Sequence, residues 1–182
     1  MTKIKIANSL IFRKIESDSD IEILQTLINK IFEKTFFTRY GLFFKQDEIT
    51  DKQYLVFDEK EIIGIFVFST ELSHKRATID LIGVLPSSQN KKYGSKILDY
   101  GLKLIKQYNP SITEVLTEVI ADDIQLSNFY IINGFIIDRI EFYGYNKQGK
   151  NILTGKPMDL NNILMNNDIS HLMVWNFLKI RV

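Results

Sequence analysis

The fold is decided by one stretch of the chain, which runs Val84-Leu85-Pro86-Ser87-Ser88-Gln89-Asn90-Lys91-Lys92-Tyr93-Gly94-Ser95. This stretch joins a β-rich apolar run to the start of an amphipathic helix. The first N–H groups of a helix lack partners and carry partial positive charge, so the junction favours a bound anion such as a pyrophosphate. Lys91 and Lys92 add positive charge. The stretch therefore predicts a phosphate-binding turn, and a lysine-rich turn exposed to solvent is the alternative.

The residues after this turn change to a helical period, and a strand follows them. The apolar stripe of the expected helix consists of Ile97, Leu98, Gly101, Leu102, Ile105 and Tyr108. Asn109-Pro110 ends the helix, because a residue before proline disfavours helical geometry. Residues 112–120 are again β-rich. The order strand, helix, strand predicts that strands 77–85 and 112–120 are parallel neighbours with a right-handed crossover.

Ahead of the turn, the sequence predicts a helix and three antiparallel strands. Ser17-Asp18-Ser19-Asp20 offers N-cap residues for a helix that extends to Phe32, after a short strand at 10–15. Turn-type residues separate the β-rich runs 54–57, 62–69 and 77–85, which predicts two hairpins. The segment from Phe36 to Phe44 is rich in aromatic residues. It either lines a pocket as a lid or packs on the sheet as a second helix.

Behind residue 120, the sequence predicts a helix, a strand, a long excursion and a closing strand. Asp122-Asp123 caps the helix, which ends at Gly134. Strands are expected at 136–145 and 171–180, and the polar residues 146–168 between them form an excursion with one helical turn near 160–165. Neither an internal repeat nor a linker is visible. The chain is therefore expected to form a single domain over residues 1–182.

The composition is that of an ordinary globular domain and excludes several classes of function. A formal net charge of +1 gives no global attraction to nucleic acid or to an anionic membrane, so neither partner is expected. The absence of cysteine excludes a disulfide framework and a thiol nucleophile. Two isolated histidines, His74 and His171, make a metal site unexpected. No apolar run resembles a secretory signal or spans a bilayer, so a cytoplasmic location is expected.

Two short motifs resemble the GNAT superfamily of N-acetyltransferases. The family's acetyl-CoA motif is Gln or Arg, two residues, Gly, any residue, then Gly or Ala. Gln89, Lys92 and Gly94 occupy these positions, so a lysine replaces the first glycine. Downstream, Phe129-Tyr130-Ile131-Ile132-Asn133-Gly134-Phe135 is similar to the family's Phe-Tyr, three residues, Gly-Phe signature. The resemblance implies an α/β (α+β) fold, a mixed, twisted sheet of about seven strands flanked by about four helices.

The resemblance also implies acetyl-CoA as co-substrate and a set of residues that hold it. These residues are Ile82, Gly83, Val84, Gln89, Asn90, Lys91, Lys92, Tyr93, Gly94 and Ser95. Backbone amides of residues 82–84 would bind the pantetheine arm and polarise the thioester carbonyl. In the family a β-bulge commonly splays the two parallel strands here, and Gly83 would accommodate it. An asparagine of the family pattern is replaced by Asp123, which is expected to serve only as a helix cap.

Catalytic groups follow from the same resemblance and from the chemistry of acyl transfer. The resemblance assigns Tyr130 the role of the acid that protonates the departing thiolate; a core tyrosine is the alternative. For the general base, Asp80 is the leading candidate, because it shares the parity of Ile82 and Val84 and a partly buried carboxylate has a raised pKa. The alternative is an ion pair of Asp80 with Lys75 or Arg76. Glu71 and Glu118 are weaker candidates, and a water chain would replace all three.

The expected function is direct transfer of an acetyl group from acetyl-CoA to a primary amine of a small molecule or peptide. The expected assembly is a monomer or homodimer without a metal ion. One alternative is an inactive acyl-CoA-binding regulatory domain, suggested by Lys92 and Asp123. Another is a nucleotide-binding domain that uses the same lysine-rich turn. The sequence does not discriminate among amine acceptors.

Overall fold

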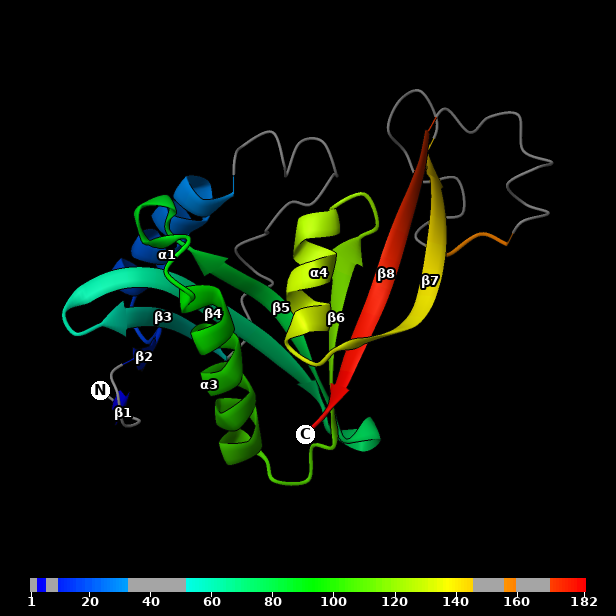
Figure 1. Ribbon diagram of the computed structural model, residues 1–182. Helices are drawn as coiled ribbons and strands as arrows, with labels where there is room; N and C mark the ends of the chain where they lie inside the picture. Colours follow the sequence, from blue (N-terminus) through cyan, green and yellow to red (C-terminus); the bar gives the residue numbers. More distant parts are fainter. Residues whose placement is uncertain (1–2, 6–9, 33–51, 146–155, 160–170) are drawn as a thin grey trace. The chain divides into compact units, whose positions relative to one another are not determined.

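The computed structural model describes residues 3–5, 10–32, 52–145, 156–159 and 171–182 (Figure 1). The chain divides into two compact units, the first formed by residues 1–115 with Val182 and the second by residues 116–181. Each unit is described by itself below. The expected segments 36–44, 146–155 and 160–168 lie outside the described residues. None of the described helices is both long and apolar enough to span a bilayer.

The first unit is built on an antiparallel sheet whose strands follow one another in chain order. Its strands are β1 (Lys3–Lys5), β2 (Leu10–Lys14), β3 (Gln53–Asp58), β4 (Glu61–Glu71) and β5 (Arg76–Val84). A short 3-10 turn, η2 (Leu72–His74), joins β4 to β5, and Lys75 after it has a left-handed backbone. The predicted pair of hairpins is confirmed. The three-residue β1 was not predicted.

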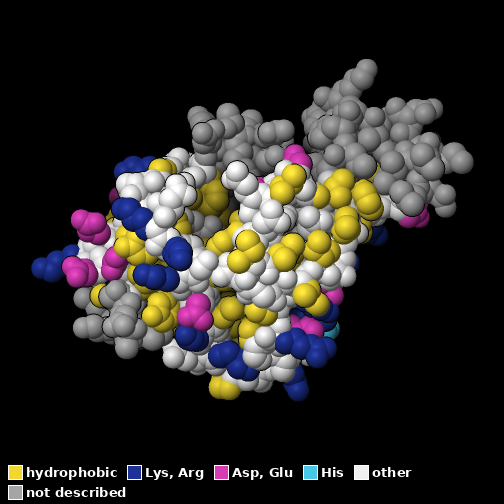
Figure 2. All heavy atoms as spheres, in the orientation of Figure 1, with side chains coloured by type: hydrophobic (Ala, Val, Ile, Leu, Met, Phe, Trp, Pro, Cys, Tyr) yellow, Lys and Arg dark blue, Asp and Glu magenta, His cyan; other side chains and the backbone are white. Residues whose placement is uncertain are grey.

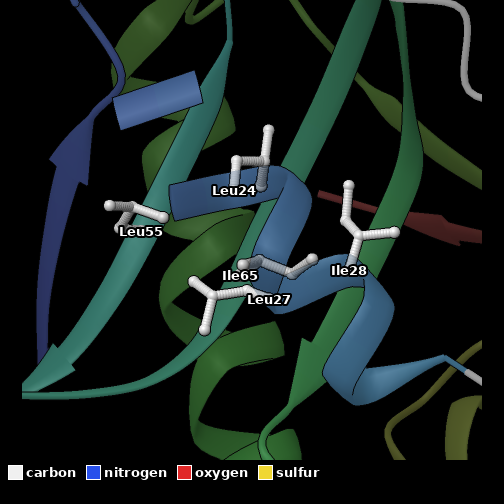
Figure 3. Packing of buried hydrophobic residues seen from close by; sticks show 5 residues of the cluster. All are labelled: Leu24, Leu27, Ile28, Leu55 and Ile65. Carbon is white, nitrogen blue, oxygen red and sulfur yellow. The ribbon is translucent and has the colours of Figure 1, made fainter. Parts of the chain in front are cut away.

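Helix α1 (Asp18–Ile31) covers one face of this sheet. The Ser17 side chain caps it by accepting a hydrogen bond from the Asp20 N–H. Leu24, Leu27 and Ile28 of the helix are buried against Leu55 of β3 and Ile65 of β4, as Figure 3 shows. Successive side chains of a strand point to opposite faces. Gln53, Leu55, Ile65 and Val67 therefore share the face under α1.

Helix α3 (Tyr93–Tyr108) covers the other face of the same sheet. Its buried residues are Ile97, Leu98, Gly101, Leu104 and Ile105. Gly101 lies so close to Phe66 of β4 that an added Cβ would come within 2.4 Å of the ring. The predicted stripe is therefore largely confirmed. Leu104 is buried in it in place of Tyr108, which is half exposed, and Leu102 is only partly buried.

The second unit contains three strands and one helix among its described residues. The elements are β6 (Glu114–Ile120), whose first two residues belong to the first unit, α4 (Ile124–Ile132), β7 (Ile136–Tyr145) and β8 (His171–Arg181). β8 lies between β6 and β7 and pairs antiparallel with β7. Asp123 caps α4 by accepting a hydrogen bond from the Leu126 N–H at 2.9 Å. Gly134 follows the helix with a φ of +94°, as predicted for a residue at the helix end.

The mixed α/β architecture predicted from the sequence is confirmed. The described residues contain eight strands and three α-helices, against the predicted seven and four. The additional strand is β1. A single domain over the whole chain stays a prediction.

Candidate active site

The predicted phosphate-binding turn lies between β5 and α3 in the first unit. A 3-10 turn, η3 (Pro86–Ser88), follows β5, and the Ser88 N–H donates to the Leu85 carbonyl at 2.8 Å. The side-chain amide of Gln89 donates to the carbonyl of Val84 at 3.1 Å. Gln89 thus closes the turn back onto the end of β5. The first residue of the motif therefore has a structural role in this chain.

Lys92 stands where the family motif has glycine, and its backbone explains the preference for glycine. Its φ and ψ are 62° and 15°, in the left-handed region. Asn90, two residues earlier, also has a φ of 62°. A left-handed residue other than glycine costs roughly 1–2 kcal/mol. Lys92 therefore has a backbone conformation that favours glycine, although glycine is missing at this position.

The start of α3 presents its backbone N–H groups without a side-chain cap. Lys92 occupies the N-cap position and makes no capping hydrogen bond. Lys91 Nζ donates to the Ser87 carbonyl at 3.1 Å, and both lysines are exposed. Figure 2 shows Lys and Arg side chains on this side of the molecule, together with Asp and Glu side chains. An uncapped helix start with nearby lysines is a favourable place for a phosphate group.

The strand segment 82–84 ends β5 directly before this turn. An added Cβ on Gly83 would lie 2.8 Å from the Ile31 side chain at the end of α1. On β4, an added Cβ on Gly64 would lie 2.2 Å from the Gly83 carbonyl oxygen. Packing therefore requires both glycines. A bulge lies in the antiparallel pairing of β4 and β5, because Val67 pairs with Leu81 and Phe68 with Ile79, which leaves Asp80 as the extra residue. The bulge expected at Gly83, between the two parallel strands, stays a prediction.

The bulge changes where Asp80 points. Ile82 is opposite Phe66 and therefore faces α3. Asp80 accepts a hydrogen bond from Ser69 Oγ at 3.0 Å, and alternation along β4 places Ser69 on the α1 face with Val67. Asp80 thus lies on the face opposite Ile82. The predicted common parity is wrong, because the bulge adds one residue.

The alternative ion pair of Asp80 with Arg76 is not the one that Arg76 forms. Arg76 Nε lies 3.0 Å from Glu114 Oε2 instead. Glu71, a weaker candidate base, is exposed and lies 2.7 Å from His74 Nδ1. His74 is thus an exposed turn residue, as expected. Asp80 is exposed as well.

Gln53 is a polar residue on the α1 face, and it was not predicted from the sequence as a site residue. It pairs with Val67, is 2% exposed, and neither polar atom of its side chain finds a hydrogen-bond partner among the described residues. With Ser69 and Asp80 it makes this end of the face polar. Gln53 alternates along the strand with the apolar residues Leu55 and Phe57, and this pattern could have indicated its burial.

In the second unit, Tyr130 lies inside an aromatic cluster. It is 3% exposed, and its ring centroid lies 5.1 Å from those of both Phe129 and Phe135, edge to face. Burial raises the pKa of Tyr130 to about 12, against the lowering effect of its hydrogen bond with the Thr117 side chain. The hydroxyl is therefore protonated at neutral pH. An acid must hold its proton, and this group does.

A group of ionisable residues lies around Glu118 of β6. Crowding of its carboxyl by protein atoms, and then the Glu141 carboxylate, raise the pKa of Glu118, although the residue is exposed and Arg139 opposes the shift. Glu141 accepts hydrogen bonds from Arg139 Nε and Tyr143 Oη, both at 2.6 Å. Residues 139, 141 and 143 alternate along one strand and so lie on one face of it. This spacing could have indicated the group from the sequence.

The turn and Tyr130 both lie within residues 21–135, which match the model of the acetyltransferase (GNAT) family. The match covers more than half of the chain. The protein belongs to the acetyltransferase (GNAT) family. The resemblance found from two short motifs is therefore confirmed, and so is the classification as an acyltransferase. A comparison with curated protein sequences found no match.

Solved structures of low sequence identity share this fold. One is the ribosomal-protein-S18-alanine N-acetyltransferase from Escherichia coli, with 13% identity, a TM-score of 0.60 and coverage of 95% of this chain and 94% of that chain. A spermidine/spermine N-acetyltransferase from Vibrio cholerae has 13% identity, a TM-score of 0.60 and coverage of 95% and 92%. A GNAT family acetyltransferase from Elizabethkingia anophelis with acetyl-CoA bound has 18% identity, a TM-score of 0.61 and coverage of 96% and 99%.

Proposed function

We propose that this acetyltransferase transfers the acetyl group of acetyl-CoA directly to a primary amine of a small molecule or peptide. One observation carries the proposal: the turn between β5 and α3 has the left-handed backbone at Lys92 and the uncapped helix start that a pyrophosphate requires. The fold is shared with an acetyltransferase that has acetyl-CoA bound. It is also shared with enzymes named for a protein alanine and for polyamines.

Acetyl-CoA would be held by the residues predicted for it. Backbone N–H groups of residues 89–95, with the charges of Lys91 and Lys92, would bind the pyrophosphate. Residues 82–84 would bind the pantetheine arm through their backbone. The co-substrate supplies the activated acyl group as a thioester. The chain supplies orientation, so that an amine meets the thioester carbonyl in a reactive geometry.

Tyr130 would act as the acid. As the C–S bond breaks, the sulfur takes up the bonding electron pair, and the Tyr130 hydroxyl donates a proton to it. The raised pKa of Tyr130, about 12, keeps its hydroxyl protonated at neutral pH, so a proton is available at the sulfur as the thiolate leaves. Thr117 orients the hydroxyl. The core position of the tyrosine is compatible with this role because the aromatic neighbours fix the ring.

The base that takes a proton from the acceptor ammonium would be a carboxylate. Asp80 remains the candidate predicted from the sequence, and Ser69 orients it. Glu118 becomes a stronger candidate than the sequence indicated, because its raised pKa makes it a better proton acceptor. Asp80→Asn and Glu118→Gln distinguish them. The base is the residue whose loss removes the acidic limb of the pH–rate profile.

The proposal is tested by the release of CoA thiol when acetyl-CoA is mixed with the protein and a panel of primary amines. The panel contains an alanine-terminated peptide, spermidine, an amino sugar and free amino acids. Thiol release that depends on the amine, with an acetylated product, is expected. Binding of acetyl-CoA without turnover favours the regulatory domain, and stronger thermal stabilisation by ATP favours the nucleotide-binding domain. A cytoplasmic location, a monomeric or homodimeric state and the absence of a nucleic-acid partner stay predictions.

A further inference from the structure

The turn between β5 and α3 is fixed at both ends and open in the middle. At its start, Gln89 is hydrogen-bonded to the Val84 carbonyl. Among the described residues, the N–H groups of Asn90, Lys91 and Lys92 make no backbone hydrogen bond. Open N–H groups are available to an anion, but they do not hold the turn in shape. The far end of the turn therefore needs its own anchor.

That anchor is a side-chain hydrogen bond between two separate elements of the first unit. Tyr93, the first residue of α3, donates its hydroxyl to the carboxylate of Asp58, the last residue of β3. The two residues are 35 positions apart in the sequence. Lys96 Nζ lies 5.4 Å from the centre of the Tyr93 ring and adds a cation–π contact. The hydrogen bond ties the start of the helix to the β3–β4 hairpin.

We propose that Tyr93 and Asp58 form a clamp that holds the turn in its anion-binding shape and thereby sets the affinity for acetyl-CoA. Both are positioning residues, since they act through the backbone of the turn. The inference rests on the proposed function. Tyr93 occupies the variable position between Lys92 and Gly94, so the family motif does not specify it.

The physical reason for a clamp is the conformation of Asn90 and Lys92. Both residues have a φ of 62°, which is unfavourable for residues other than glycine. A free turn of this sequence would relax into other conformations. Binding of the ligand would then have to order the turn, and the free energy that this requires would reduce the affinity. A preorganised turn avoids that cost. The clamp therefore holds Asn90 and Lys92 in a conformation that residues other than glycine disfavour.

Asp58 has two opposing effects, and they can be separated. As a hydrogen-bond acceptor it secures Tyr93, whereas its negative charge near a phosphate site repels the ligand. Asp58→Asn keeps an acceptor oxygen and removes the charge. Asp58→Ala removes both. Tyr93→Phe removes the hydrogen bond and leaves the charge.

The test measures the dissociation constant of CoA by calorimetry for the full chain and for these variants. Tyr93→Phe and Asp58→Ala are expected to weaken binding about 2- to 10-fold, the range for one partly exposed hydrogen bond. The double variant should be no weaker than the weaker single variant, because both changes break the same bond. Asp58→Asn should bind CoA at least as well as Asp58→Ala binds it, and better than Tyr93→Phe. The KM of Tyr93→Phe for acetyl-CoA should rise together with its dissociation constant for CoA, as expected for a residue that acts on binding.

Tyr108→Phe, at the other end of α3, is the matched control and should bind CoA like the wild type. If Tyr93→Phe binds CoA as tightly as the wild type does, the clamp is overturned. This holds even if the variant melts at a lower temperature. Better binding by both Asp58 variants, with no effect of Tyr93→Phe, overturns it too, since only the charge would then matter. A wild-type protein that binds no CoA would contradict the proposed function itself. The two failures are therefore distinguishable.

Discussion

The turn before α3 and the helix that carries Tyr130 are both assigned to the reaction, yet they depend on different parts of the chain. The turn acts through backbone: open N–H groups and left-handed residues at Asn90 and Lys92. Tyr130 would act through one side chain, which lies in an aromatic cluster. The turn matches its family motif incompletely, and the helix matches completely. A site built from backbone N–H groups therefore tolerates a changed side chain, whereas the loss of a catalytic hydroxyl would not be compensated.

The largest effect is expected from Tyr130→Phe. Loss of a general acid lowers kcat by about 10²- to 10⁴-fold. The dissociation constant of CoA should not change, because the turn lies in the other unit. Steady-state kinetics and calorimetry measure the two quantities. A kcat within about threefold of the wild type would remove Tyr130 as the acid and leave it as a core residue.

Gly64→Ala should have the next largest effect, on the backbone that leads into the turn. The new Cβ would lie 2.2 Å from the carbonyl oxygen of Gly83, so β4 and β5 must move apart. We expect a loss of about 2–3 kcal/mol in the free energy of unfolding and weaker CoA binding. Denaturant titration measures the first quantity. Ser111→Ala, at an exposed position, is the control. An unchanged stability would show that the two strands do not approach as closely as described.

Substitutions of Lys92 should have smaller effects that depend on backbone conformation. Lys92→Gly should leave stability within about 1 kcal/mol of the wild type, because relief at φ 62° offsets the greater freedom of the unfolded chain. Lys92→Val should cost about 1–2 kcal/mol, since a β-branched residue is poorly suited to a positive φ. Lys91→Val is the matched control. If Lys91→Val costs as much as Lys92→Val, side-chain contacts and not backbone strain decide this turn.

The smallest effect is a pH dependence at Glu118. Crowding of its carboxyl by protein atoms, and then the Glu141 carboxylate, raise the pKa of Glu118 in the folded state. A carboxyl with a raised pKa stabilises the fold while it is protonated, and this stability is lost as the pH rises through the folded pKa. Glu118→Gln should therefore raise the melting temperature at neutral pH and leave it unchanged near pH 4. An equal change at both pH values would contradict the raised pKa.

The order of elements was largely predictable from the sequence because it depends on local periods. Residues 97–105 recur at helical spacing, and the runs 54–57, 62–69 and 77–85 are β-rich and bounded by turns. The end of α4 was predictable because Gly134 suits a positive φ. Such features are set within a few residues, and a single sequence displays them.

The bulge at Asp80 and the burial of Gln53 were not predictable in the same way. The bulge arises from the pairing of β5 with β4, and no residue type near Asp80 indicates it in the sequence. Gln53 is buried because β3 lies between β2 and β4 with α1 on one face. Both features depend on neighbours distant in sequence. The conformation of Lys92 was not predicted, although glycine at that position of the motif is compatible with a positive φ.

We propose that this chain uses a backbone anion site and a tyrosine acid to acetylate an amine. The most direct test is CoA thiol release from acetyl-CoA in the presence of the amine panel, measured for the wild type and for Tyr130→Phe. We expect amine-dependent thiol release by the wild type and a rate at least about 100-fold lower for the variant. A wild-type protein that binds acetyl-CoA but acetylates none of the amines would contradict it.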